Sequence, residues 1–219
     1  LTSPNRIKLL DMQSGKISVQ SENIFPIIKK FLYSEQEIFL RELISNAVDA
    51  TTKLKTLSNR GEVKGELTNL NIEIIADTEA KTLTIRDRGI GMTEEEVNKY
   101  LNQVAFSSAQ EFMDKYKDEA SIIGRGGLGF YSAFMVSDKV EVVTKSYKEN
   151  SVGVKWTCNG ETDYTIENVE KTERGTDIIL FLNEECQTYL ENQRLATLLE
   201  KFCKFLPIPI QLGTTKEKI

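Results

Sequence analysis

The chain has 219 residues, a formal net charge of −5, no histidine and three cysteines. The acidic balance argues against general affinity for nucleic acid, and the lack of histidine excludes histidine-based acid–base catalysis and most zinc sites. No apolar run is long enough to span a membrane, residues 1–11 lack the apolar core of a signal peptide, and the scattered cysteines favour a reducing compartment, so we expect a cytoplasmic protein that binds neither nucleic acid nor membrane.

The predicted elements fall into two groups, with helices gathered early in the chain and strands gathered late. Residues 1–11 are interpreted as an N-terminal extension or a remnant of cloning, and residues 12–219 as one domain. In chain order we predict a strand at 16–20, helices at 22–33 and 35–57, a loop at 58–69, a hairpin of strands at 71–76 and 82–87, helices at 93–103, 109–116 and 130–136, strands at 140–145, 152–158, 164–169 and 177–182, a helix at 192–205 and a strand at 208–212.

Local signals refine this pattern. Ser34 is the expected N-cap of the helix at 35–57, and Thr93 with Glu96 forms a capping box at the helix that follows the hairpin. Pro207 and Pro209 suit an edge strand. Early helices and late strands predict an α+β two-layer sandwich, in which a mixed, mostly antiparallel sheet is covered on one face by helices, rather than a βαβ repeat.

The most informative pattern lies on the helix at 35–57, where Glu42, Asn46 and Asp49 are spaced i, i+4 and i+7. In a helix of 3.6 residues per turn, this spacing places all three on one face. Two acids and an amide are costly to bury without partners, and a Mg²⁺-bound nucleotide would supply them. Glu42 would then activate water, and the amide oxygen of Asn46 would bind the metal. The alternative is an ordinary amphipathic helix in which Asp49 pairs with Lys53.

A second pattern is the turn DRGIGM, which begins at Asp87 at the end of the strand at 82–87. The strand directs Asp87 toward a partly buried pocket, and the glycines let the backbone approach a ligand closely. A carboxylate there can accept a hydrogen bond from the exocyclic amine of a purine, and the Thr176 hydroxyl can support it. Taken alone, the turn is also an ordinary strand-to-helix turn, and Thr176 an ordinary strand residue.

A third pattern is the glycine-rich run GRGGLGF at 124–130, which precedes a predicted helix. Backbone amides in such a loop can bind an anion, whereas the alternative is a flexible loop. The run lacks the GK[ST] of a P-loop, and no βαβ unit precedes it as a Rossmann fingerprint requires. The acid–amide–acid helix, the DRGIGM turn, this loop and the Gly175–Thr176 pair follow one another in order, which favours a nucleotide site over four coincidences.

These motifs resemble those of the gyrase, heat-shock chaperone, histidine-kinase and mismatch-repair ATPases. Within that superfamily the chain is most similar to the N-terminal nucleotide domain of the ninety-kilodalton heat-shock chaperones, and to the bacterial members in particular. The segments that carry the resemblance are SEQEIFLRELISNAVDA, RDRGIGMTEEEV, GLGFYSAFMVSDKVEV and ERGTDIILFL. The resemblance implies a Bergerat-type ATP-binding fold with a lid at about residues 94–126.

The resemblance also implies roles for individual residues. Glu42 matches the general base for water attack on the γ-phosphate, Asn46 matches the Mg²⁺ ligand, and Asp87 matches the acid that binds the adenine amine. The other residues implied to contact ATP or ADP are Asp49, Ala50, Lys53, Gly91, Met92, Asn102, Gly127, Gly129, Phe130 and Thr176.

The implied function is that of an ATP-binding and ATP-hydrolysing domain of a chaperone, which assists unfolded or partly folded clients and closes its lid on Mg-ATP. Hydrolysis by this chain is expected to be slow, because the family supplies an arginine from its middle domain. The full-length chaperone is expected to be a homodimer, the isolated domain a monomer, and the pocket a target for competitive inhibitors. The alternatives are the ATPase domain of a DNA-acting gyrase or mismatch-repair relative, a sensor histidine kinase, and a binding module that does not hydrolyse ATP.

Overall fold

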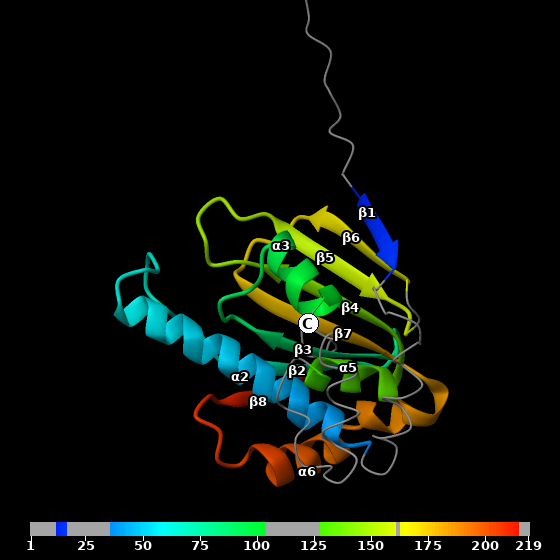
Figure 1. The fold of residues 1–219 in the computed structure, drawn as a ribbon. Helices are drawn as coiled ribbons and strands as arrows, with labels where there is room; N and C mark the ends of the chain where they lie inside the picture. Colours follow the sequence, from blue (N-terminus) through cyan, green and yellow to red (C-terminus); the bar gives the residue numbers. More distant parts are fainter. Residues whose placement is uncertain (1–11, 17–35, 104–127, 161–162, 215–219) are drawn as a thin grey trace, which may run out of the picture.

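The structure, a computed structural model, describes residues 12–16, 36–103, 128–160 and 163–214. Within these residues, eight strands form one sheet in the order β1-β6-β5-β4-β7-β3-β2-β8 (Figure 1). Neighbouring strands are antiparallel except β2 and β8, which run parallel. The strands are β1 Met12–Lys16, β2 Ile72–Asp77, β3 Thr82–Asp87, β4 Ser137–Lys145, β5 Gly153–Cys158, β6 Asp163–Val169, β7 Gly175–Leu182 and β8 Ile210–Thr214.

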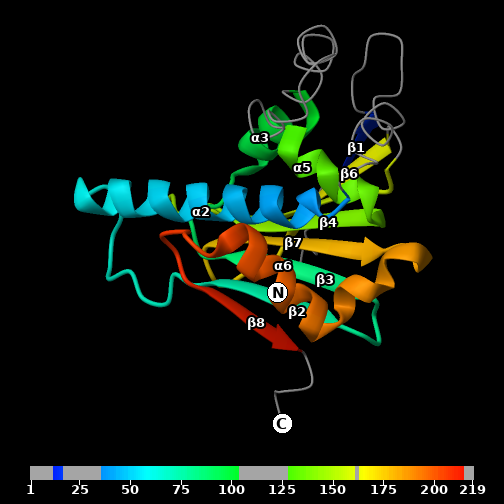
Figure 2. The ribbon, with the colours of Figure 1, turned by 90° about the horizontal axis from the view of Figure 1, so that it is seen from below.

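One face of this sheet is the core face. Along β2, buried residues alternate with half-buried ones, as expected of a strand with one covered side. Helix α2, Ile38–Asn59, crosses the covered side, and the short helices α3, Glu94–Val97, and α5, Leu128–Tyr131, lie on the same side (Figures 1 and 2). The predicted α+β two-layer sandwich, with a mostly antiparallel sheet, is confirmed.

Helix α2 is long because its apolar residues recur at helical spacing. Leu40, Leu43, Ile44, Ala47 and Leu54 are all buried and form the stripe that packs on the core. At the other end of the sheet, helix α6, Asn192–Cys203, packs against α2 and β8. None of the helices in these described ranges is long and apolar enough to cross a membrane.

The start of α2 differs from the prediction. The helix begins at Ile38, with Glu37 at the N-cap position, so the prediction of Ser34 as its N-cap is wrong. Gln36 is fixed outside the helix because its side-chain amide donates to the Met135 carbonyl and to the Cys186 sulfur. A tertiary contact, rather than a local cap, therefore decides where the helix starts.

The capping box at Thr93 is confirmed, but the helix that follows is not regular. The Thr93 hydroxyl accepts from the Glu96 N–H at 3.3 Å, and the Glu96 carboxylate accepts from the Thr93 N–H at 3.3 Å. After the one turn of α3, the chain continues as a π-helical turn, Asn98–Gln103. The wider turn changes which side chains face the core, which a 3.6-residue periodicity does not foresee.

The boundaries of other helices and strands also differ from the predicted ones. Strand β1 ends at Lys16, where the first strand was predicted to start, and the predicted helix at 130–136 is α5 followed by a 3₁₀ turn, Ser132–Met135. A 3₁₀ helix at Glu184–Leu190 was not predicted. Strand β8 is an edge strand as predicted, although it starts after both prolines. The predicted helices at 22–33 and 109–116 lie outside the described residues.

Candidate functional site

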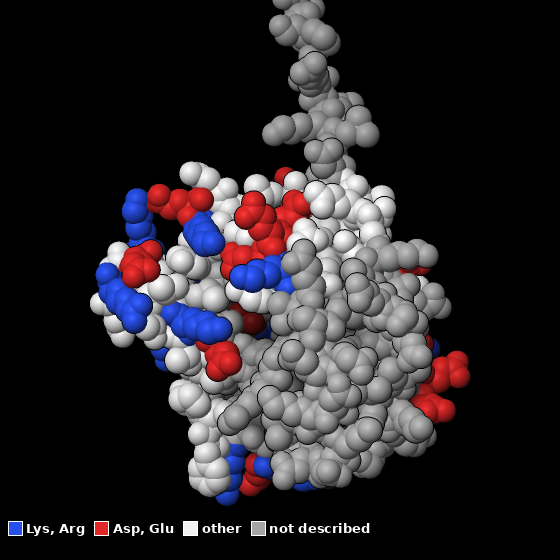
Figure 3. All heavy atoms as spheres, viewed as in Figure 1, with Lys and Arg blue, Asp and Glu red and all other residues white. Residues whose placement is uncertain are grey.

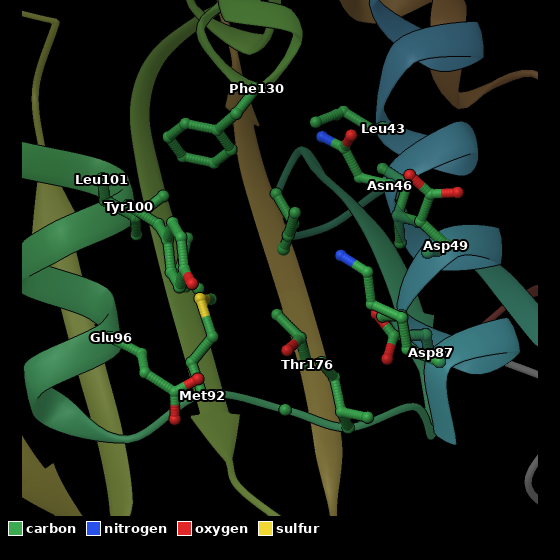
Figure 4. Close-up of a pocket in the computed structure, with 18 residues that line it drawn as sticks. Leu43, Asn46, Asp49, Asp87, Met92, Glu96, Tyr100, Leu101, Phe130 and Thr176 are labelled. Carbon is green, nitrogen blue, oxygen red and sulfur yellow. The ribbon is translucent and has the colours of Figure 1, made fainter. Parts of the chain in front are cut away.

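A cavity of about 340 Å³ lies between α2 and the core face of the sheet, and the π-helical turn and α5 bound its far side (Figure 4). Most of its lining is apolar, with a few polar groups among it, as in sites that bind a small organic ligand. The predicted site residues that line it are Asn46, Asp49, Ala50, Lys53, Asp87, Gly91, Met92, Phe130 and Thr176. The structure therefore brings together most of the residues that the sequence singled out, from four separate segments.

Asp87 is the most perturbed acid of the cavity. It ends β3, it is 6% exposed, and its carboxylate accepts from the Gly89 N–H at 2.9 Å. The pKa of this carboxyl is raised to about 7, mainly by burial and also by the negative charge of Asp177, while the N–H groups of Gly89 and Thr176 oppose the rise. A buried acceptor that is only partly satisfied by the protein is available to a donor on a ligand.

Two threonine hydroxyls stand beside this carboxyl. In the sheet, Thr176 pairs with Asp87 on one side and with Thr144 on the other, and the two hydroxyl oxygens are 2.8 Å apart. The Thr144 hydroxyl also accepts from the Met92 N–H at 2.9 Å. Thr144 thus ties the turn that follows β3 to the sheet, and the sequence analysis missed it because only the pairing of β4 with β7 brings it there.

The turn after β3 depends on glycine at position 91. Gly91 has φ +60°, and a Cβ added to it would overlap the backbone carbonyl of Lys145. The neighbouring Ile90 donates its N–H to the Ala50 carbonyl of α2 and accepts from the Tyr147 N–H. The turn is therefore held between α2 and the end of β4, and its residues Ile90, Gly91 and Met92 line the cavity.

Helix α2 supplies the polar side chains of the opposite wall. Asn46, Asp49 and Lys53 are exposed and line the cavity. No ion pair of the described residues joins Asp49 to Lys53, so the alternative interpretation of these residues as a surface salt bridge gains no support. Figure 4 shows Asn46 and Phe130 at one end of the cavity, and Asp87 and Thr176 at the other.

Glu42 lies on the same helix but not in the cavity lining. It is 5% exposed, and its carboxylate pairs with the Arg41 guanidinium at 3.3 Å. A Cβ added to Gly129 would come within 2.6 Å of the Glu42 Oε2, so the glycine lets α5 approach this carboxylate. Glu42 and Gly129 are thus adjacent, one turn of α2 beyond Asn46.

Nine of the lining residues were not predicted as site residues. Six of them are apolar residues of α2, the sheet and the turn after β3, and the other three form the opposite wall. Glu96, Tyr100 and Leu101 come from α3 and the π-helical turn, and they face α2 across the cavity. The capping box predicted a helix after the DRGIGM turn, but it did not indicate which side of that helix would face a ligand.

Asn102, another predicted site residue, does not line the cavity. Asn102 is buried and binds Trp156 and Asn98 through its side chain. Gly127, like residues 104–126 of the predicted lid, lies outside the described residues. The roles of both in nucleotide binding stay predictions.

The donor set of the cavity fits a nucleotide with a metal ion. The described residues contain no group of three or more acidic, histidine or cysteine side chains that would hold a metal by themselves. Mg²⁺ in nucleotide sites keeps several waters and is held by one or two protein oxygens together with phosphate oxygens. The Asn46 amide oxygen, with Asp49 close by, matches that requirement, whereas a dedicated protein-only metal site does not.

Comparisons with known proteins agree with this geometry. The model of the family described as "Histidine kinase-, DNA gyrase B-, and HSP90-like ATPase" matches residues 33–186. The chain is 59% identical to the chaperone protein HtpG of Bacteroides fragilis over 207 residues, and 56% identical to that of Porphyromonas gingivalis over 206 residues. Each match covers 94% of this chain and 30% of the relative, so the chain spans less than a third of the length of these chaperones.

The family match covers more than half of the chain, and it includes helix α2, the DRGIGM turn and the Gly175–Thr176 pair. The resemblance inferred from the sequence is thereby confirmed. This chain belongs to the histidine kinase-, DNA gyrase B- and HSP90-like ATPases, and within them it is similar to the bacterial chaperone HtpG.

Proposed function

We propose that this chain binds Mg-ATP and Mg-ADP in the cavity and hydrolyses ATP as the nucleotide domain of a molecular chaperone. The observation that carries the proposal is Asp87, a buried carboxyl that lines the cavity beside the Thr176 hydroxyl. Its carboxylate accepts a hydrogen bond from the exocyclic amine of adenine, a charge-assisted contact worth about 1.5–3 kcal/mol. Guanine carries an oxygen at that position, which a carboxylate would repel.

The other end of the cavity takes the phosphates. Asn46 would hold Mg²⁺ there, and Lys53 contributes positive charge. When bound, the ion neutralises phosphate charge. Glu42 acts as the general base, and its carboxylate must leave Arg41 to reach a water molecule at the cavity. Asp49 and Gly129 shape the polar wall on which the phosphates lie.

Hydrolysis by this chain alone is proposed to be slow. Phosphoryl transfer depends on cations that stabilise the charge of the transition state, and Lys53 is the only cation among the described residues that line the cavity. We propose that a further arginine comes from another domain of the longer protein. In that protein, ATP binding closes a lid at about residues 94–126 because ATP binds the closed state better.

The chaperone role rests on the relatives. The relatives described above are named chaperone protein HtpG. We therefore propose that the full-length protein acts on unfolded or partly folded clients in the cytoplasm as a homodimer, and that this domain alone is a monomer. Competitive inhibitors of ATP would occupy the same cavity. A DNA-acting role, as in a gyrase or mismatch-repair protein, is not favoured, because the net charge is −5 and acidic and basic side chains are interspersed on the described surface in Figure 3.

The test is calorimetric titration of Mg-ADP into this domain and into Asp87→Asn. We expect the variant to bind about 10- to 150-fold more weakly, because its amide cannot replace the charged acceptor. The matched control is Asp77→Asn, which changes an acid at the end of neighbouring β2 that does not line the cavity. Failure of the parent to bind ADP, or equal binding by Asp87→Asn, would contradict the proposal.

A further inference from the structure

The far wall of the cavity is a short segment that must be held in place by contacts outside itself. Tyr100 and Leu101 line the cavity from the π-helical turn, Asn98–Gln103, which follows a single turn of α-helix. Segments of one or two helical turns are unstable alone, and tertiary contacts decide their position. The position of Tyr100 and Leu101 therefore depends on whatever anchors this turn.

Asn102 is the residue that anchors it. Its side-chain oxygen accepts from the indole N–H of Trp156 at 2.9 Å, and its side-chain nitrogen donates to the Asn98 oxygen at 3.0 Å. Asn98 in turn donates to the Glu94 carbonyl at 3.3 Å, so the amides tie the π-helical turn back to α3. Asn102 is 5% exposed and does not line the cavity, which leaves its polar atoms committed to the protein.

Trp156 links this anchor to the rest of the cavity. It is fully buried on β5, pairs with Val142 of β4, and meets the Phe130 ring edge-on at 5.6 Å between ring centres. Val142 and Phe130 both line the cavity. Trp156 therefore supports two lining residues, Val142 and Phe130, directly. It supports the far wall, which Tyr100 and Leu101 form, through Asn102.

A second contact acts on the same turn. The Tyr131 hydroxyl, which is fully buried, donates to the Leu101 carbonyl. Tyr131 follows Phe130 in α5, and their rings pack edge-on. The π-helical turn is thus tied both to the sheet, through Trp156, and to α5, through Tyr131, and both ties meet next to Phe130.

We propose that Asn102 is a positioning residue for the nucleotide site, acting through Trp156, rather than a residue that touches the nucleotide. This inference rests on the proposed function, because the ligand whose affinity it changes is ADP. The Asn102–Trp156 hydrogen bond holds Tyr100 and Leu101 at a fixed distance from α2. Loss of the bond lets the far wall shift, and ADP then binds more weakly although none of its direct contacts has been removed.

A double-mutant cycle distinguishes positioning from direct contact. Asn102→Leu removes the acceptor and leaves the indole N–H of Trp156 buried without a partner, and Trp156→Phe removes the donor while keeping a ring against Phe130. Each single variant is expected to bind ADP about three- to tenfold more weakly than the parent, the range for one buried hydrogen bond. The double variant leaves neither the indole N–H of position 156 nor the side-chain oxygen of position 102 unpaired, and it is expected to bind at least as well as the weaker single variant.

A second readout separates positioning from general loss of stability. Hydrogen exchange of the amides at 98–103 is expected to accelerate in both single variants, without ADP present, and exchange in α2 is expected to stay unchanged. Tyr189→Phe is the matched control, because it also removes one polar atom from a buried aromatic ring, at a site whose hydroxyl contacts Gln36 away from the cavity. The control is expected to change neither ADP affinity nor exchange at 98–103.

Each outcome decides the inference. Weak binding by Asn102→Leu with parental binding by Trp156→Phe would show that Asn102 touches the nucleotide directly, and parental binding by both would show that the bond positions nothing. Unchanged amide hydrogen exchange at 98–103 in both single variants would show that the Asn102–Trp156 hydrogen bond does not anchor the turn. If the parent does not bind ADP, the proposed function fails, and the exchange measurement still decides whether Asn102 anchors the turn.

Discussion

The two ends of the cavity are built in different ways. The end that contains Asp87, Thr144 and Thr176 is made by neighbouring strands of one sheet, where each residue is fixed by its strand pairing and all three side chains are buried. The end that contains Asn46 is made by side chains that project from helices, and Asn46 itself is exposed.

This difference matches what each end has to do in the proposed reaction. A base is recognised by a rigid pattern of donors and acceptors, which a sheet supplies without further adjustment. The phosphate groups change their charge distribution and geometry during hydrolysis, and side chains on helices can follow those changes. We therefore expect substitutions at the sheet-built end to act on affinity, and substitutions at the helix-built end to act on turnover.

The largest expected effect is at the helix-built end, in Glu42→Gln. Removing the proposed general base should slow ATP hydrolysis by about 100- to 10,000-fold, because glutamine cannot take a proton from water. ADP affinity should change by less than about threefold, since Glu42 does not line the cavity. Release of labelled phosphate under single-turnover conditions, with calorimetry on the same samples, measures both quantities.

Glu37→Gln is the control for that experiment. Glu37 lies just before α2, is paired with Arg194 and Lys201, and is remote from the cavity lining. Its variant should hydrolyse ATP at the parental rate. An equal loss of turnover in both variants would mean that the helix, and not the base, had been damaged.

The next effect is at the sheet-built end, in Gly91→Ala. A methyl group at a position with φ +60° would overlap the Lys145 carbonyl, so the turn must move away from α2 and β4. We expect a loss of about 3 kcal/mol in the free energy of unfolding and no ADP binding detectable by calorimetry. Chemical denaturation of the two proteins measures the first quantity.

Gly61→Ala isolates the steric part of this effect. Gly61 also has a positive φ, +75°, but nothing lies within 4 Å of an added Cβ. Its variant should lose only about 1 kcal/mol, from backbone strain, and should bind ADP as the parent does. Equal losses at the two glycines would show that the close approach of Gly91 to Lys145 does not matter.

The sequence predicted the parts of the site that depend on local pattern. Asp87 could be found because a strand ends on it and glycines follow, and Asn46 and Asp49 because helical spacing places them on one face. Thr144 could not be found, because its contact with Thr176 depends on how β4 pairs with β7, two strands that lie far apart in the chain. Pairing register is a property of the whole sheet.

The positions of Tyr100, Leu101 and Glu42 relative to the cavity could not be predicted either, because they also depend on the tertiary structure. Tyr100 and Leu101 face the cavity because the chain widens into a π-helical turn after α3, and nothing in the local sequence marked that change. Glu42 shares a helical face with Asn46, but that face is longer than the cavity. Glu42 therefore lies under α5, next to Gly129, and not in the cavity lining. Fold class and strand content were confirmed because they depend on many residues at once.

Of the effects compared between the two ends of the cavity, the response of the sheet-built end to pH is the smallest. The pKa of Asp87 is raised to about 7 by burial, so the carboxyl is largely neutral at pH 6 and largely ionised at pH 8. If only the ionised form accepts from the adenine amine, ADP affinity should be about eightfold lower at pH 6 than at pH 7.5. Calorimetry over this range, in buffers of matched ionic strength, measures the slope.

The same shift fixes the sign of a stability effect, which provides an independent check. Because the folded protein holds a proton that the unfolded chain releases, the stability from this group is fully present below the pKa of an unfolded aspartate and is lost as pH rises through about 7. Asp87→Asn should lack both pH dependences. Tighter ADP binding at pH 6 than at pH 7.5 would mean that the neutral acid binds adenine, as a donor to the ring nitrogen, and that the sheet-built end recognises the base with a proton of its own.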